Sequence, residues 1–261
     1  MRQIFARQLQ ESLKIYKEKQ IEMRPIEYIG AAPVKKKRRS SLGGWLMVAF
    51  ALGLGGFFVH PLIPFLRAQT DLTSPANVRE AMSSLISDGD FGSRLAAAAL
   101  ERTQSEVNFD NVYYQIDFPG GDIASDRGKA EDVIVRAYRE VGIDLQVDVH
   151  ADIRENFYSY PQIFGAKEPD TNIDHRRVQN LQRFFSRKGQ ALAISQDEED
   201  YSFGDIVVWQ LLDGNKHIGI VVPGPGAKKT ERWVVHNIGN GPEWEKKLFD
   251  YTIKGHYRYG G

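Results

Sequence analysis

The feature that most constrains this chain is an uncharged apolar segment near its N-terminus. From Leu42 to Leu66 there is no Asp, Glu, Lys or Arg, and the residues from Leu42 to Val59 are all apolar, aromatic or glycine. At 1.5 Å per residue, a helix of this length crosses a hydrocarbon core of about 30 Å. The sequence therefore predicts one transmembrane helix over residues 42–66.

The charges on either side of this segment predict its orientation. Residues 1–41 contain eleven Lys and Arg against four Glu, a net charge of +7, and the remaining residues contain 23 Lys and Arg against 30 Asp and Glu, a net charge of −7. Five consecutive basic residues, 35–39, precede the segment, whereas Arg67 alone follows it directly. Such a bias keeps the basic end in the cytoplasm. We expect a single-pass protein with residues 1–41 as a basic cytoplasmic tail.

Other interpretations of the N-terminal region remain open at this point. A cleaved secretory signal would need a basic region of about forty residues, which is far longer than usual. Glycines at 53, 55 and 56 suggest a surface for homodimer formation through the membrane helix. Phe5, Leu9, Leu13 and Tyr16 recur at helical spacing and predict an amphipathic helix on the inner leaflet or against a partner, with a solvated tail as the alternative.

Composition excludes several classes of function. A net charge of −7 beyond the tail is a poor match for nucleic acid, because binding to phosphates requires clustered Lys and Arg. The chain has no cysteine, so disulfides, thiolate metal sites and a thiol nucleophile are all absent. No HExxH motif or paired-histidine spacing is present. We therefore expect no metal and no cofactor.

For the residues after the predicted transmembrane helix, the sequence predicts helices followed by strands. Ser74 and Pro75 predict the N-cap and first residue of a helix that extends toward Ile86. Further predicted helices cover residues 93–104, 130–141 and 174–188, the last one capped by Asp174. Predicted strands cover residues 112–116, 205–211, 217–222, 233–237 and 253–259. This order predicts an α+β fold with an antiparallel sheet packed on helices. We assign residues 67–90 to a stalk and residues 91–261 to one domain.

Several sequence blocks in a fixed order resemble the YijF-like bacterial proteins, a family known as domain of unknown function 1287. The resemblance covers residues 93–261. It is carried by the blocks Phe118 to Asp122, Asp126 to Arg139, Asn172 to Val178, Phe203 to Trp209, His217 to Val221, Val235 to Gly239 and Gly255 to Tyr259. The family looks like a branch of the papain-like, NlpC-type cysteine peptidases, many of which cut peptide bonds in bacterial peptidoglycan. The resemblance thus implies a papain-like domain.

The resemblance also implies the positions of a catalytic site. In such enzymes a cysteine opens a helix, a histidine follows on a strand, and a polar residue on the next strand orients that histidine. His217 matches the base and His236 the orienting residue, with Asn237 as an alternative. The cysteine aligns with Ala130. The residues that we expect to contact substrate are Asp132, Asp174, His175, Arg176, Arg177 and Trp209, with either Arg176 or Arg177 binding a carboxylate. For the segment 174–177, a helix start with solvated basic residues is an equally weighted interpretation.

Alanine at position 130 changes what this site can do. Removing the nucleophile from such a constellation lowers turnover by on the order of a millionfold. Glu131 also adds a carboxylate where a thiolate would be disfavoured. Either the protein is a natural pseudoenzyme, or Ala130 is an inactivating substitution of a native cysteine. Glu131, which an engineer would have no reason to introduce, favours the natural origin.

Three functional hypotheses follow. The leading one is an inactive domain, anchored in the inner (plasma) membrane of a bacterium and exposed in the periplasm or outside, that binds peptide, peptidoglycan or an envelope partner. The second is an active peptidoglycan amidase or endopeptidase whose natural sequence has cysteine at position 130. The third is a scaffold that organises an envelope complex through its tail and membrane helix.

Overall fold

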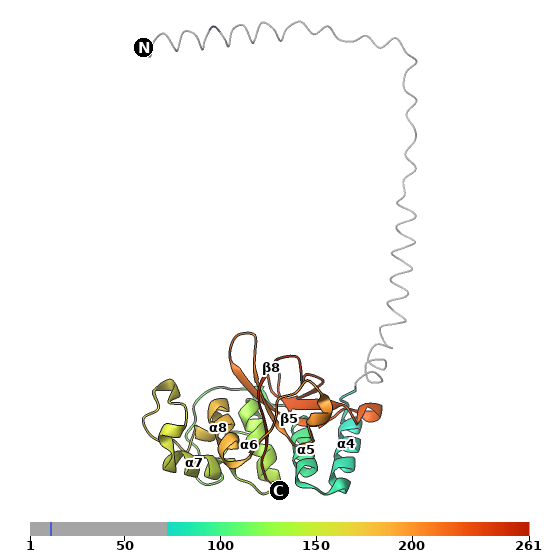
Figure 1. Cartoon of the computed structure of the whole chain (residues 1–261), viewed down its shortest axis with the longest axis horizontal. Coiled ribbons are helices and arrows are strands. Elements are labelled where there is room, and N and C mark those ends of the chain that lie inside the picture. Colours follow the sequence, from blue (N-terminus) through green and yellow to red (C-terminus); the bar gives the residue numbers. More distant parts are fainter. Residues whose placement is uncertain (1–10, 12–71, 261) are drawn as a thin grey trace. The chain divides into compact units, whose positions relative to one another are not determined.

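The computed structural model describes residue 11 and residues 72–260. The predicted amphipathic helix and the predicted membrane helix at 42–66 lie outside these residues, apart from residue 11. Among the described residues, no helix combines the length and the apolar character needed to cross a bilayer. The folded part is an α+β domain in which helices pack on an antiparallel sheet, as the sequence predicts (Figure 1).

Two helices open the domain and pack against each other (Figure 1). Helix α4 spans Pro75–Asp88 with Ser74 as its N-cap, and Gly89 at φ 75° ends it in the left-handed conformation that glycine favours. Helix α5 spans Phe91–Arg102. Val78 and Leu85 of α4 are fully buried in the core. The segment that the sequence assigns to a stalk therefore contains a helix that is part of the domain.

The sheet has six strands in the order β3-β8-β4-β5-β6-β7, and every neighbouring pair is antiparallel. The four strands predicted after residue 200 are confirmed with small shifts at their ends, whereas two short strands were not predicted. The bounds are β3 Gln190–Ala191, β4 Ile206–Gln210, β5 Lys216–Pro223, β6 Arg232–His236, β7 Glu243–Glu245 and β8 Thr252–Arg258.

Because side chains alternate along the strands, both faces of the sheet carry buried residues. Ile218, Ile220 and Val235 belong to the larger core, which they share with the helices. Val221 and Val234 point the other way, into a smaller core closed by loops. Because successive side chains of a strand project to opposite faces, this pattern requires that both faces of the central strands be covered. With both faces covered, a ligand can reach the central strands only at their ends.

Three helices in the middle of the chain complete the helical layer. Helix α6 spans Ala130–Glu140, α7 spans Leu145–Glu155 and α8 spans Val178–Lys188. Helix α7 was not predicted, although Asp144 caps it by accepting a hydrogen bond from the Gln146 N–H. Helices α5, α6 and α8 all contact β5 (Figure 1).

Two predictions of regular structure are wrong. The helix predicted from Asp174 is divided into a 3-10 turn, η4 (Asp174–Arg176), and α8, with Arg177 in extended conformation between them. Asp174 does not cap α8; its carboxylate accepts the Asp170 N–H at 2.7 Å. Residues 112–116 form no strand, since the Ile116 N–H donates to the Asn172 side chain instead of to a sheet neighbour.

The remaining elements are short. The bounds are β1 Asn108–Phe109 and β2 Arg127–Gly128, which pair in parallel, with 3-10 turns η2 Phe157–Ser159, η3 Ile163–Gly165, η5 Glu198–Asp200 and η6 Gly226–Lys228. The β1–β2 pair brings residues 108–109 next to the segment that leads into α6. It therefore sets one wall of the site described next.

Candidate functional site

Helix α6 begins at Ala130, the position that the sequence analysis aligns with a nucleophile. The Asp132 carboxylate accepts the backbone N–H of Lys129 at 2.9 Å, which fixes the start of the helix. Ala130 is buried but lines a cleft of about 490 Å³, together with His217. We call this hollow the Ala130 cleft. A methyl group at the positive end of a helix is thus part of its lining.

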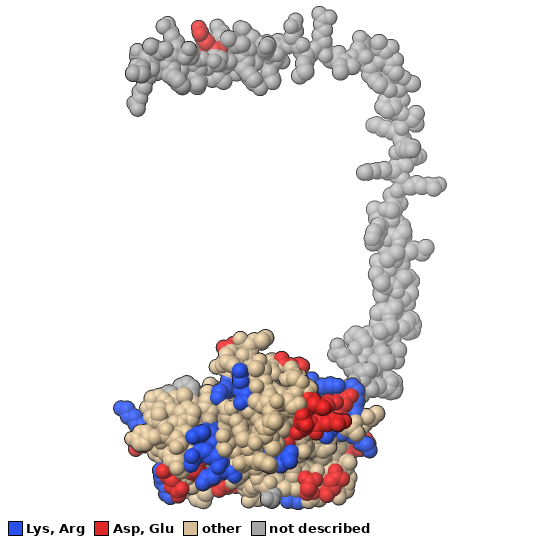
Figure 2. Space-filling view, viewed as in Figure 1, with Lys and Arg blue, Asp and Glu red and all other residues tan. Residues whose placement is uncertain are grey.

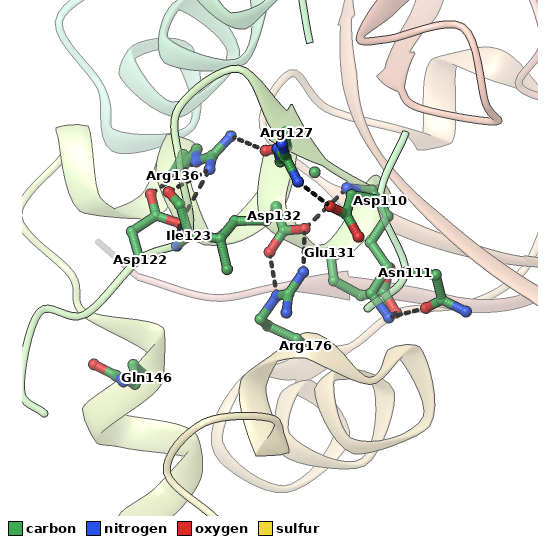
Figure 3. Close-up of polar contacts among 12 residues, drawn as sticks. Asp110, Asn111, Asp122, Ile123, Arg127, Glu131, Asp132, Arg136, Gln146 and Arg176 are labelled. Carbon is green, nitrogen blue, oxygen red and sulfur yellow. Dashed lines mark hydrogen bonds and ion pairs between the residues drawn. The ribbon is translucent and has the colours of Figure 1, made fainter. Parts of the chain in front are cut away.

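Two ion pairs hold the N-terminal half of α6, and one of them, Arg176–Asp132, is almost fully buried (Figure 3). The guanidinium of Arg176 reaches Asp132 with Nε at 2.6 Å and Nη2 at 3.1 Å, and both side chains are almost fully buried. The guanidinium of Arg136 binds Asp122 in the same two-point manner, at 2.8 and 3.1 Å. These four residues form the α6 ion-pair cluster. Two-point contacts of this kind restrict the direction of the helix as well as its position.

Two histidines and a glutamate on neighbouring strands form a second polar cluster, and one of them, His217, lines the cleft. Nε2 of His217, on β5, lies 2.8 Å from Nδ1 of His236, on β6. Nε2 of His236 lies 3.0 Å from the Glu245 carboxylate, on β7. The Lys247 ammonium contacts the same carboxylate oxygen at 2.8 Å. We call His217, His236 and Glu245 the histidine network.

The order of contacts in the histidine network fixes where its protons lie. A carboxylate only accepts hydrogen bonds, so His236 must donate from Nε2 to Glu245. In a neutral imidazole the other nitrogen then accepts, and His217 must donate from Nε2 to His236 Nδ1. Nδ1 of His217 consequently carries a lone pair. Among the described residues this atom has no hydrogen-bond partner, and the ring that bears it lines the cleft.

Burial keeps the two histidines neutral. Burial, together with the neighbouring His236 and Lys247, lowers the pKa of His217 to about 3. Burial also lowers the pKa of His236, and this outweighs the opposite effect of Glu245. The pKa of Glu245 itself is lowered, because hydrogen bonds from Lys247 and His236 overcome the effect of its burial. A charged glutamate and two neutral imidazoles are therefore the stable state at neutral pH.

Trp209 supports the histidine network from within the sheet. Its indole stacks on His217, with ring centroids 5.9 Å apart and planes at 28°, and its Nε1–H donates to the Leu248 carbonyl at 2.8 Å. Gly219 leaves the space for this ring, since a Cβ there would lie 3.0 Å from it. Trp209 is 1% exposed. The structure thus places this predicted substrate contact behind His217.

The Ala130 cleft is mixed in character. Exposed aromatic side chains of Phe109 and Tyr113 line it, and so do charged groups of both signs. Lys129 and Glu131 form an ion pair at 3.1 Å beside Ala130. Burial raises the pKa of Glu131. The full lining is Phe109, Asn111, Tyr113, Lys129, Ala130, Glu131, Ile173, Arg177, Val178, Gln179, Leu211, Asp213, Asn215, Lys216, His217, Asn237 and Ile238.

The charge distribution on the face shown in Figure 2 does not indicate the sign of a ligand. Figure 2 shows Lys and Arg in small groups that alternate with groups of Asp and Glu on the face in view. A surface of mixed sign does not steer a charged ligand from a distance.

The predicted catalytic positions and substrate contacts divide into two sets in the structure. Ala130, His217 and Arg177 line the cleft. Arg176 and Asp132 are bound to each other beneath α6. His175 is 2% exposed, and burial lowers its pKa to about 4. Asp174 is also buried, which raises its pKa, and it contacts His150 at 3.4 Å. Contact of either set with a ligand stays a prediction.

Sequence reasoning missed Glu245, and it assigned the orienting role to His236 with Asn237 as an alternative. The structure places His236 against His217, whereas the Asn237 amide donates to the Gly128 carbonyl at 3.2 Å. Glu245 lies on a strand of three residues with no predictive pattern of its own. Its only sequence signal is an acidic residue two positions from Glu243, in a segment rich in charge.

The fold and the site together define an α+β protein with a histidine-lined cleft at the start of a central helix. The chain belongs to the family described as domain of unknown function (DUF1287), whose sequence profile matches residues 96–259. It is 44% identical over 165 residues to the uncharacterized protein YijF of Escherichia coli (strain K12), an alignment that covers 63% of this chain and 80% of that protein.

Proposed function

We propose that this protein is an extracytoplasmic, membrane-anchored domain of cysteine-peptidase type that binds peptides of the cell wall without cleaving them. The observation that carries the proposal is Ala130, the first residue of α6, which lines the same cleft as His217. His217 is backed by His236 and Glu245 as a base would be. A cysteine at the start of α6 would complete a nucleophile, base and orienting group. A methyl group leaves a binding cleft with no attacking atom.

The dimensions and lining of the cleft support a peptide as the ligand. Its volume of about 490 Å³ lies within the range of pockets that bury small ligands. Phe109 and Tyr113 offer apolar contact, while Asn111, Asn215 and Gln179 offer donors and acceptors for amide groups. Arg177 and Lys216 also line it and suit the carboxylates of peptidoglycan stem peptides.

Binding is tested by co-sedimentation of the full-length chain with purified sacculi. Phe109→Ser removes an exposed aromatic group of the cleft and should weaken sedimentation by roughly tenfold, the usual effect of losing one well-packed contact. Tyr158→Ser removes an aromatic side chain that is 93% exposed and outside the cleft, and should have no effect. Failure of the unaltered chain to sediment, or release of peptides by it, would contradict the proposal.

The anchor is a separate part of the proposal and rests on the charge bias around residues 42–66. Because the chain has no cysteine, single thiols report topology without background. A membrane-impermeant maleimide added to intact cells or spheroplasts should label Tyr158→Cys and leave Ser40→Cys unlabelled until the membrane is opened. Labelling of Ser40→Cys from outside, or equal protection of both, would exclude the proposed topology.

An active amidase or endopeptidase is the second candidate, favoured by the complete histidine network. With cysteine at position 130, the thiolate would attack the amide carbonyl to form a thioester, and His217 would pass the thiol proton to the leaving amine. Water would then hydrolyse the thioester and return the thiol. Peptide release from sacculi by Ala130→Cys, absent when His217→Gln is added, would show that the cleft retains this capacity. A cysteine codon at position 130 in the natural gene would establish this candidate as the better one.

A further inference from the structure

We infer that a small recess between the end of α5 and the start of α6 binds one halide ion, in nature chloride, on the guanidinium of Arg102. We call it the Arg102 recess. No member of the histidine network lines it, and the inference does not depend on the proposed function. The lining is Arg102, Ser105, Val107, Gly128, Lys129, Asp132, Val133, Arg136 and Pro242.

The observation that points to a ligand is a buried donor without a partner. Arg102 is the last residue of α5 and is half-buried. Its Nε atom is shielded from solvent and has no hydrogen-bond partner within the part of the chain that the structure describes. Arg102 forms no ion pair there either. A buried donor of a charged group is costly to leave unsatisfied, so it favours a ligand that brings an acceptor.

The charge of the recess favours an anion. Its lining carries three cations against one carboxylate, a net charge of +2. Every charged member of the lining except Arg102 belongs to an ion pair, and these pairs are Lys129 with Glu131, Arg136 with Asp122, and Asp132 with Arg176. Arg102 is therefore the cation that these pairs leave without a counterion. An anion beside it would compensate a charge that is partly removed from water.

The size of the recess restricts the anion to a single atom. Its volume is about 10 Å³, which is the space of one water-sized occupant. Phosphate, sulfate and a carboxylate group are too large for it. Val107, Val133 and Pro242 contribute apolar surface to the lining, and Ser105 contributes a hydroxyl that can donate. A halide is the anion that combines this size with the need for donors alone.

A water molecule is the alternative occupant, and the buried acceptors of the lining argue against it. A buried water makes about three hydrogen bonds, so it must donate as well as accept. The Gly128 carbonyl already accepts two N–H groups, each at 3.2 Å. The Asp132 carboxylate already accepts three N–H groups, from Lys129 and Arg176. A halide donates nothing, and it therefore suits a recess whose unsatisfied buried group is a donor.

The position of the ion gives it a role in the fold. Gly128 and Lys129 form the segment that leads directly into α6, and both line the Arg102 recess. Lys129 also lines the Ala130 cleft. A halide on Arg102 thus connects the end of α5 to the start of α6, two helices that pack against each other. Binding of the ion stabilises the folded chain, because the unfolded chain has no such recess.

The experiment measures chloride binding to the full-length chain by broadening of the chlorine NMR signal, and stability by urea denaturation in sodium chloride and in sodium methanesulfonate of equal ionic strength. Chloride should broaden the signal and raise the urea midpoint. Arg102→Met should weaken chloride binding by about tenfold or more, the effect of losing a hydrogen bond from a charged group, and should abolish the difference between the salts. Arg94→Met removes an exposed arginine of the same helix outside the recess, and should keep both effects.

Crystals of the unaltered protein soaked in sodium bromide give a second measurement, which does not require a variant to fold. An anomalous bromide peak in the Arg102 recess, together with the higher urea midpoint in chloride, would support the inference. A water molecule there without such a peak would overturn it. A peak without any effect of chloride on the midpoint would indicate an adventitious ion only, and would overturn it as well. Equal chloride affinity of Arg102→Met and Arg94→Met would have the same consequence.

Discussion

The α6 ion-pair cluster and the histidine network are both clusters of interacting polar side chains, and they differ in whether every atom is satisfied. Asp132 and Arg176 face each other with two contacts, and Arg136 donates to Asp122 and to backbone carbonyls. The histidine network ends instead at an open lone pair on a cleft. This difference distinguishes the residues that hold α6 from His217, which lines the cleft.

The largest effect should come from breaking the closed cluster. Arg176→Met leaves the carboxylate of Asp132 buried without its partner, which typically costs about 3–5 kcal/mol. Urea denaturation followed by tryptophan fluorescence measures the change. The control is Lys246→Met, which removes a surface ion pair with Glu231 and should leave the midpoint unchanged. Equal effects of the two variants would show that burial of the pair does not matter.

Acid should destabilise the protein through its buried histidines rather than through the ion pairs. The pKa values of about 3 for His217 and about 4 for His175 lie below the unfolded value of 6.5, so the unfolded chain binds more protons once the pH falls below 6.5. Stability is therefore complete above that pH and declines as it falls, by roughly 2 kcal/mol per histidine between pH 7 and pH 5.

Urea midpoints measured across this range test the assignment. His217→Gln should remove about half of the loss that the two histidines cause together. Hydrogen bonds from Arg187 and Tyr160 lower the pKa of Asp152 to about 2 despite its burial. Its contribution to stability is complete above its unfolded pKa of 3.8 and is lost as the pH falls toward 2, so it does not alter the profile between pH 7 and pH 5. A flat profile between pH 7 and pH 5 would contradict neutral, buried histidines.

A thiol placed at the open end of the site should be acidic. In Ala130→Cys the helix N-terminus and His217 should lower the thiol pKa, and Glu131 should act against them. We expect alkylation by iodoacetamide at pH 7 to be about tenfold faster than for Tyr158→Cys, which corresponds to roughly one pKa unit. Adding Glu131→Gln should accelerate it further. A rate no greater than that of the exposed thiol would show that the site does not activate a nucleophile.

The smallest effect on stability should come from Glu245→Gln. The amide oxygen of Gln still accepts from His236 Nε2, and Glu245 is part-exposed, so the loss should be about 1 kcal/mol or less. The urea midpoint measures it beside that of Glu243→Gln. A loss as large as that of Arg176→Met would mean that Glu245 is a structural residue, and the contrast between the two clusters would disappear.

Local sequence patterns correctly predicted two kinds of element: those whose hydrogen bonds join residues close in sequence, and strands with an uninterrupted apolar pattern. The N-cap at Ser74, helix α6 and strands β4, β5, β6 and β8 are of this kind. The alternation at 112–116 predicted a strand that does not exist. Its backbone groups bind side chains from η4 and the preceding loop, Arg176 and Asn172, and nothing in the local sequence encodes that choice.

The same distinction between local patterns and contacts of distant segments explains which site residues the sequence predicted. The sequence by itself determined that no sulfur stands at position 130, and that His217 and His236 lie on neighbouring strands, because residue identity and strand order are properties of the chain. Only the tertiary structure decided that Glu245 orients both imidazoles, and that Arg176 pairs with Asp132 inside the domain. Proton positions and buried pairing depend on atoms a few ångströms apart, which strands and loops distant in sequence bring together.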